Sequence, residues 1–191
     1  MKGLSSFGEP MQQHTGRRSS QRPARSNGGA TRGVEAVPWL DLERYIGRWH
    51  GLAWLPLPFQ RRCSGELTLE YVPRDDGLVA VVSACRDEAG RLSEAHGVLR
   101  QSEPLREPAR LQLRFAPAWL HRLRFVWNEH WVIALDADYR WAVVGEPRRR
   151  YLWILGREPR MDYHLFEELK AIPRRMGYDL APLLVSRQRT D

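Results

Sequence analysis

Short segments with strand character, separated by turn residues, constrain the fold of this chain more than any other feature of its sequence. The clearest is 65–72, where Leu67, Leu69 and Tyr71 alternate with polar residues. A period of two gives a strand one apolar face and one polar face. The run Asp-Asp-Gly at 75–77 tolerates the positive φ values of a tight hairpin turn. This part of the chain therefore predicts a β-hairpin.

The same patterns along the chain predict eight strands, most of them joined by short hairpin connections. A longer connection, 116–130, separates the fifth strand from the sixth. Many short strands at regular spacing are typical of an all-β sandwich or barrel. The expected strands cover 48–55, 65–72, 78–84, 92–101, 110–115, 131–136, 141–145 and 151–157.

The segment after the eighth strand changes to a helical period. Asp162 is suited to the N-cap of a helix, and Gly177 can end it. Pro173 disfavours a helix interior, so we expect a kink or an early stop there. A short last strand at 183–185 would follow. The apolar residues at helical spacing are Leu165, Phe166, Leu169, Ile172 and Met176.

Most of the positive charge lies at the start of the chain. Residues 1–33 hold six basic residues and one acidic residue, and so carry +5 of the net charge of +7. This segment is rich in Ser, Arg, Gly, Gln and Pro and reads as a disordered tail. We therefore expect one folded domain at 34–191, and the charge gives little reason to expect specific binding of nucleic acid.

The sequence shows no signature of a metal site, a cofactor or a catalytic centre. Cys63 and Cys85 have no zinc-type spacing, and the six histidines form no H-x-H or H-x-x-x-H pair. No G-x-S-x-G motif, Ser/His/Asp motif or haem-attachment signature is found. We expect a protein that binds neither metal nor cofactor and is not an enzyme.

Three short motifs resemble the signatures of the lipocalin family. They are Gly47-Arg48-Trp49 at the start of the first strand, Asp138-Tyr139 in the turn after the sixth, and Arg157 at the end of the eighth. The longer stretches 41–49 and 151–157 resemble the branch that includes bacterial Blc and apolipoprotein D. The resemblance covers roughly residues 37–188.

The resemblance implies an eight-stranded antiparallel up-and-down β-barrel with one C-terminal helix packed outside. It also implies a non-catalytic protein that holds a lipid in the barrel interior, for lipid transport or storage in the cell envelope. Bacterial relatives of this kind are outer-membrane lipoproteins, which suggests the outer membrane or periplasm. The residues as written contain no signal peptide and no lipoprotein cysteine near the start. Localisation therefore stays open, as does the alternative that translation starts elsewhere.

Connections in an up-and-down barrel alternate between its two ends. Counting from Trp49 places Gly47, the Asp138-Tyr139 turn and Arg157 at one end, the floor. An indole facing a guanidinium there would contribute ~0.5–2 kcal/mol. We expect this contact to close the floor rather than to bind a ligand.

The same counting predicts a cationic rim at the other end, the mouth. A cationic rim above an apolar interior suits a fatty acid or a (lyso)phospholipid, whose head would stay at the rim. The alternative is that these arginines are simply solvated. The expected rim comprises Arg61, Arg62, Arg86, Arg122, Arg124, Arg148, Arg149 and Arg150.

Inward-facing residues of the upper strands are the candidate ligand contacts, although each would also suit an ordinary core. A register error of one residue would turn any strand's side chains to the opposite face. The candidates are Ala53, Leu55, Leu67, Leu69, Tyr71, Leu113, Phe115 and Trp153, with Phe59 at the lip.

The 117–130 loop mixes apolar and basic residues. Such a loop would meet a membrane surface or a partner protein, or else fold over the mouth as a lid. Two other functions stay open: a lipocalin-fold enzyme, and a module that binds a membrane surface or a partner.

The two cysteines are expected near the mouth on neighbouring paired strands. A two-residue turn would offset Cys63 from Cys85 by several positions, whereas a longer loop or a bulge would bring them close enough for a disulfide. The bond also requires an oxidising compartment. Both states of the cysteines stay open.

Overall fold

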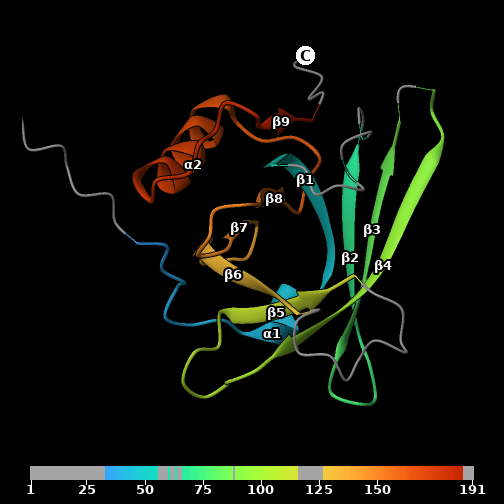
Figure 1. The fold of residues 1–191 in the computed structure, drawn as a ribbon, viewed down its shortest axis with the longest axis vertical. Helices are drawn as coiled ribbons and strands as arrows, with labels where there is room; N and C mark the ends of the chain where they lie inside the picture. Colours follow the sequence, from blue (N-terminus) through green and yellow to red (C-terminus); the bar gives the residue numbers. More distant parts are fainter. Residues whose placement is uncertain are drawn as a thin grey trace, which may run out of the picture. The chain divides into compact units, whose positions relative to one another are not determined.

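Eight antiparallel strands close into a barrel in the computed structural model, which describes residues 33–55, 60, 63, 66–87, 89–115 and 127–186 (Figure 1). Each strand pairs with the next along the chain, and β1 closes the barrel by pairing with both β2 and β8. This is the barrel expected from the sequence. The strands are β1 (Gly47–Leu55), β2 (Leu67–Pro73), β3 (Val79–Arg86), β4 (Leu92–Gln101), β5 (Arg110–Arg114), β6 (Asn128–Leu135), β7 (Trp141–Gly145) and β8 (Leu152–Gly156).

Two helices and a ninth strand accompany the barrel. The short helix α1 (Leu42–Tyr45) precedes β1, and β9 (Leu184–Val185) pairs with β1 at Ala53 and Trp54. Helix α2 (Tyr163–Arg175) begins after the N-cap Asp162, whose carboxylate accepts the Leu165 backbone N–H. No helix among the described residues is long and apolar enough to cross a membrane.

The end of α2 differs slightly from the expectation. Pro173 lies inside the helix, which continues to Arg175 before Gly177 adopts a positive φ of 84°. Proline there removes one hydrogen bond, the one that a backbone N–H at 173 would donate to the Leu169 carbonyl, and the helix ends two residues later.

A bulge in β1 changes which side chains face the interior. Gly51 pairs with Leu155, but Ala53 pairs with Ile154, so Leu52 is an extra residue. Beyond the bulge Trp54 faces inward, and Leu52, Ala53 and Leu55 pack outside the barrel. The prediction that Ala53 and Leu55 line the interior is therefore wrong, because it carried the alternation from Trp49 through the bulge.

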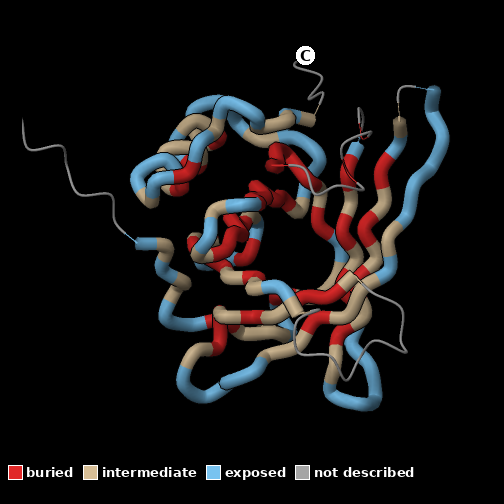
Figure 2. Tube along the Cα trace, viewed as in Figure 1, coloured by how far each residue is buried: buried red, intermediate tan, exposed pale blue. Residues whose placement is uncertain are grey.

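The buried residues form two separate clusters. Figure 2 marks the buried positions along the barrel strands and helix α2. One cluster lines the barrel interior and draws residues from all eight barrel strands. The other lies between the outer face of β1, β6, β7 and β8 and helix α2, which contributes Phe166 and Leu169. The helix thus covers one side of the barrel and leaves the interior to the strands.

Strand β6 begins at Asn128, three residues before its expected start. His130 consequently lies in the barrel wall, fully buried, rather than in a surface loop. Residues 117–126 of the expected loop lie outside the described residues, so the membrane and lid interpretations stay predictions.

Candidate ligand-binding site

Arg157 and Trp49 close one end of the barrel. The guanidinium carbon of Arg157 lies 3.8 Å from the Trp49 ring centroid. The same guanidinium donates to the backbone oxygens of Arg48 and Ile46 at 2.9 and 3.0 Å. Trp49 Nε1 donates to the Tyr45 carbonyl at 2.8 Å. The contact expected at the floor is therefore present and is tied to the backbone around it.

Gly47 and Tyr139 give Arg157 the room and the partners that it needs. Gly47 has a φ of 93°, and a Cβ there would lie 3.4 Å from Arg157 Nη1. The Tyr139 carbonyl accepts from Arg157 Nε at 3.3 Å, and its hydroxyl accepts from the Asp41 backbone N–H at 2.8 Å. The Asp138-Tyr139 turn and the first and last strands thus meet at the floor.

Asp138 is the acidic residue expected to matter in this turn, but Asp136 is the carboxylate that organises it. Asp136 Oδ2 accepts the backbone N–H groups of Asp138 and Arg140 at 3.2 and 3.1 Å. The Arg140 side chain bonds the same carboxylate, and chiefly this contact lowers the pKa of Asp136. An aspartate side chain often accepts the backbone N–H two residues later in a turn. Asp136 stands two residues before Asp138, and that spacing is the sequence signal for its role.

Six of the nine expected interior residues lie in the interior cluster or pack against it: Leu67, Leu69, Tyr71, Leu113, Phe115 and Trp153. Two glycines make room for two of them. A Cβ at Gly51 would lie 2.7 Å from Leu67 Cδ2, and one at Gly97 would lie 2.8 Å from Phe115 Cδ1. Phe59 lies outside the described residues. Contact with a ligand remains a prediction for all six.

Aromatic rings form a continuous series through the interior. The Tyr151 and Trp153 centroids are 5.3 Å apart, and so are those of Trp153 and His130. His130 lies 6.3 Å from Tyr71, whose ring lies 5.4 Å from that of Tyr45. Tyr45 in turn contacts the floor tryptophan, so the series runs from the turn after β7 to the closed end.

The interior also contains polar side chains that the sequence analysis did not single out. Gln60 is fully buried, accepts a hydrogen bond from Trp153 Nε1 at 3.4 Å and donates one to Ser83 Oγ at 3.4 Å. His130 Nε2 lies 3.5 Å from the Tyr71 hydroxyl, and burial lowers the His130 pKa to about 3. His130 is therefore neutral at physiological pH. His130 stands two positions before Val132, so the two share one face of the strand. That spacing is the sequence signal that could have placed His130 inside the barrel.

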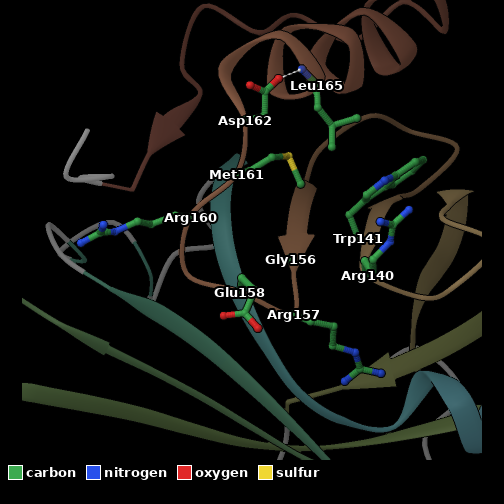
Figure 3. Close-up of a pocket in the computed structure, with 9 residues that line it drawn as sticks. All are labelled: Arg140, Trp141, Gly156, Arg157, Glu158, Arg160, Met161, Asp162 and Leu165. Atoms are coloured by element: carbon green, nitrogen blue, oxygen red, sulfur yellow. Dashed lines mark hydrogen bonds between the residues drawn. The ribbon is translucent and has the colours of Figure 1, made fainter. Parts of the chain in front are cut away.

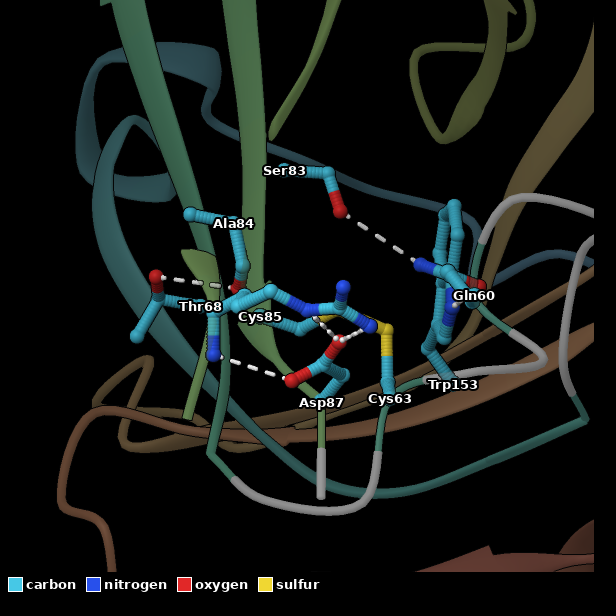
Figure 4. The surroundings of a disulfide bond; sticks show 9 residues. Gln60, Cys63, Thr68, Ser83, Ala84, Cys85, Asp87 and Trp153 are labelled. Atoms are coloured by element: carbon cyan, nitrogen blue, oxygen red, sulfur yellow. Dashed lines mark hydrogen bonds and ion pairs between the residues drawn. A yellow bond between two sulfur atoms is a disulfide. The ribbon is translucent and has the colours of Figure 1, made fainter. Parts of the chain in front are cut away.

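Cys63 and Cys85 form a disulfide, with Cα atoms 5.6 Å apart (Figure 4). Cys85 ends the inward-facing series of β3, where its backbone pairs with Leu67 of β2. The bond attaches the connection between β1 and β2 to the barrel wall, three residues after buried Gln60.

The expected cationic rim is only partly assembled. Arg148 and Arg150 line a pocket of about 390 Å³ together with Glu129 and Glu146. Arg149 instead donates to the Met176 carbonyl at the end of α2 (2.7 Å), and Arg86 to Gly90 in its own hairpin (2.9 Å). Of the other expected arginines, 61, 62, 122 and 124 lie outside the described residues. A uniformly positive rim is therefore wrong for the described part of this end, because two carboxylates share it.

Both carboxylates in this pocket are occupied by neighbouring groups. Glu146 accepts the backbone N–H groups of Arg148 and Arg150, and Arg150 Nε lies 3.6 Å from it. Glu129 accepts from Gln112 Nε2 at 3.1 Å and from Trp131 Nε1 at 2.8 Å. The exposed arginine side chains are thus the groups most available to an anion here.

A second pocket, of about 300 Å³, lies outside the barrel, where helix α2 begins (Figure 3). Trp141, Met161 and Leu165 supply its apolar lining, and Arg140, Arg157 and Arg160 also border it. No motif or pattern in the sequence predicts this pocket. Among the described residues, no three His, Cys, Asp or Glu side chains gather in a way that could hold a metal ion.

A closed antiparallel barrel with a sealed end and a mostly apolar interior defines a class of protein that can enclose a small ligand. The sequence profile of the lipocalin-like domain matches residues 40–188. The chain belongs to the lipocalin family, whose members bind small hydrophobic ligands.

Two curated relatives match most of the chain. Temperature-induced lipocalin-1 of Arabidopsis thaliana is 31% identical over 151 residues, which cover 78% of this chain and 80% of the relative. Outer membrane lipoprotein Blc of Escherichia coli strain K12 is 31% identical over 155 residues, which cover 80% and 82%. The relation to Blc expected from the sequence motifs is confirmed.

Solved structures show the same fold at lower identity. Insecticyanin from the tobacco hornworm Manduca sexta matches with a TM-score of 0.60 at 18% identity, covering 81% of this chain and 84% of that one. At this identity the similarity concerns the fold alone.

Proposed function

We propose that this protein binds a single-chain lipid, a fatty acid or a (lyso)phospholipid, with its tail inside the barrel, and that it acts without catalysis in lipid transport or storage in the cell envelope. The interior cluster supports this proposal, because its side chains are mostly apolar and Arg157 with Trp49 closes one end of the barrel. The proposal therefore has the tail enter from the opposite end.

Burial of the tail would supply most of the affinity. About 14 methylenes at ~0.8 kcal/mol each give roughly 11 kcal/mol before the costs of association and chain ordering. A dissociation constant near micromolar is consistent with that balance.

The pocket beside Arg148 and Arg150 is the proposed place for the anionic head. Arg150 is 60% exposed, so its attraction for an anion is screened by water and salt. The arginines would thus set a preference for anionic over neutral heads, and the interior would set the affinity.

Two neighbouring valines of β3 test whether the tail lies inside. Val81 is fully buried and faces the interior, whereas Val82 lies half-buried on the outer face of the same strand. In titrations with a fluorescent C16 fatty acid, Val81→Trp should weaken binding at least tenfold and Val82→Trp less than twofold. Circular dichroism and the unfolding midpoint show whether each variant is folded. Normal binding by a folded Val81→Trp variant would show that the ligand lies elsewhere.

A second pair of variants tests the head. Arg148→Ser/Arg150→Ser should reduce the preference for an anionic over a neutral amphiphile of equal chain length by about threefold to tenfold. Arg86→Ser is the control, because Arg86 bonds its own hairpin. An unchanged preference in the double variant would remove these arginines from the site.

A further inference from the structure

Three buried polar atoms around Trp153 make no hydrogen bond in the part of the chain that the structure describes. They are Trp54 Nε1, His130 Nδ1 and the Tyr151 hydroxyl. The rings of His130 and Tyr151 each lie 5.3 Å from Trp153. Trp54 pairs with Trp153 in the register of β1 and β8, and both face the interior. The three atoms therefore belong to one region of the barrel.

Such a group of unpaired atoms is unfavourable in an empty barrel. An unsatisfied buried donor or acceptor loses its hydrogen bonds to water without replacing them, and buried polar atoms in folded proteins are nearly always paired. A nonpolar residue at 130 or 151 would fill the same space without that cost. The occurrence of three unpaired polar atoms in one region indicates a site whose hydrogen bonds are completed by a ligand that enters the barrel.

The chemistry of the three atoms favours an uncharged oxygen. The indole N–H of Trp54 only donates, so its partner must be an acceptor. The Tyr151 hydroxyl keeps its proton because burial raises its pKa well above the usual value. His130 is neutral, and its Nδ1 atom donates one hydrogen bond in one tautomer and accepts one in the other. No formal positive charge is among them.

The surroundings also disfavour an anion at this depth. After burial itself, the Glu146 carboxylate is the largest influence that raises the pKa of Tyr151, and Glu129 acts in the same direction. Arg150 opposes them, but its guanidinium lies beside Glu146 and is exposed to solvent. Of the charged groups that influence the pKa of Tyr151 among the described residues, Arg150 is the cation, and a ligand carboxylate next to Tyr151 would thus meet negative charge from Glu146 and Glu129.

We propose that Trp54, His130 and Tyr151 form a neutral hydrogen-bonding subsite inside the barrel that takes a hydroxyl, ketone or ester oxygen of the ligand. This rests on the proposed function, since it requires a ligand in the interior. Tyr151 directly follows Arg150 in the chain, so the subsite adjoins the arginines that would meet a charged head. The ligand class is then a lipid with an uncharged oxygen next to or within its apolar part.

Matched C12 ligands test the subsite. Dodecan-1-ol and methyl dodecanoate each present one uncharged oxygen, whereas 1-chlorododecane has the same chain and no comparable acceptor. Each would displace a fluorescent probe from the wild type, from His130→Phe/Tyr151→Phe and from Tyr163→Phe. The double variant keeps the rings and removes the polar atoms. Tyr163 is exposed on α2, outside the barrel, and serves as the matched control.

The measured quantity is the ratio of affinities for the oxygenated ligands and the chloroalkane, because ligand hydration cancels when this ratio is compared between proteins. The ratio should fall at least tenfold in the double variant and stay within twofold in Tyr163→Phe. If all ligands bind and the ratio is unchanged, the atoms serve only trapped water and the subsite is refuted, while the proposed function stands. If the wild type binds none of the ligands, the proposed function fails and the subsite with it.

Discussion

The Arg157 guanidinium covers the Trp49 ring at 3.8 Å and also donates to the Tyr45 carbonyl, which accepts the Trp49 indole N–H as well. One backbone oxygen therefore joins the two side chains that close the barrel. The floor is held by a shared network rather than by the cation-π contact alone.

Substitution of Trp49 and substitution of Arg157 should lower the unfolding free energy of the protein by different amounts. Trp49→Ala removes a fully buried indole and should cost ~3–5 kcal/mol in unfolding free energy through the cavity that it leaves. Arg157→Lys keeps the charge but loses the planar fork, and should cost ~1–3 kcal/mol. Arg48→Lys, at an exposed ion pair with Glu70, is the control and should change stability by less than about 1 kcal/mol. Urea unfolding measures all three. A stable Trp49→Ala variant that loses only ligand affinity would contradict the structural role of the floor.

Gly47→Ala should destabilise the protein by about 1–2 kcal/mol, because a φ of 93° is strained for any residue with a Cβ. Gly33→Ala is the matched control, since nothing lies within 4 Å of a Cβ there. Equal unfolding midpoints for the two variants would refute the requirement for glycine at 47.

His130 should make stability depend on pH. Its pKa is about 3 in the folded protein and 6.5 in the unfolded chain, so only the unfolded chain takes up the proton between these values. Folding stability is therefore unaffected by His130 above pH 6.5 and falls as the pH drops toward 3, by up to about 1.4 kcal/mol per pH unit. Between pH 7 and 5 the wild type should lose about 2 kcal/mol more than His130→Phe. Identical losses would mean that His130 is not buried in its neutral form.

The disulfide should stabilise the folded protein by about 3 kcal/mol, as expected for a loop with a sequence separation of 22 residues. Cys63→Ser/Cys85→Ser should lower the unfolding free energy by that amount in an oxidising buffer. The double variant should match the wild type measured with reductant. Two freely alkylated thiols in protein isolated without reductant would contradict the bond.

The strands and the floor could be predicted because their signals are local. Alternation defined most strands within a few residues, and counting connections placed Trp49 and Arg157 together. The bulge at Leu52 could not be predicted, since nothing in the local pattern distinguishes it from regular alternation, and it moved Ala53 and Leu55 to the outside.

The candidate site was harder to predict than the fold. His130 follows a long connection, so its place in the wall depended on where β6 begins. The rim depended on where each arginine side chain points. Arg149 has a φ of 57°, and its side chain bonds the Met176 carbonyl at the end of α2. The place of His130 and the directions of the arginine side chains depend on tertiary contacts, which the periodicity of the sequence does not predict.

Native mass spectrometry of freshly purified protein shows whether the barrel carries a lipid from the cell. We expect one lipid-sized adduct per chain in the wild type and in Val82→Trp, and none in folded Val81→Trp, whose new indole would occupy the interior. An adduct retained by folded Val81→Trp at the wild-type level would place the ligand outside the barrel and refute binding in the interior.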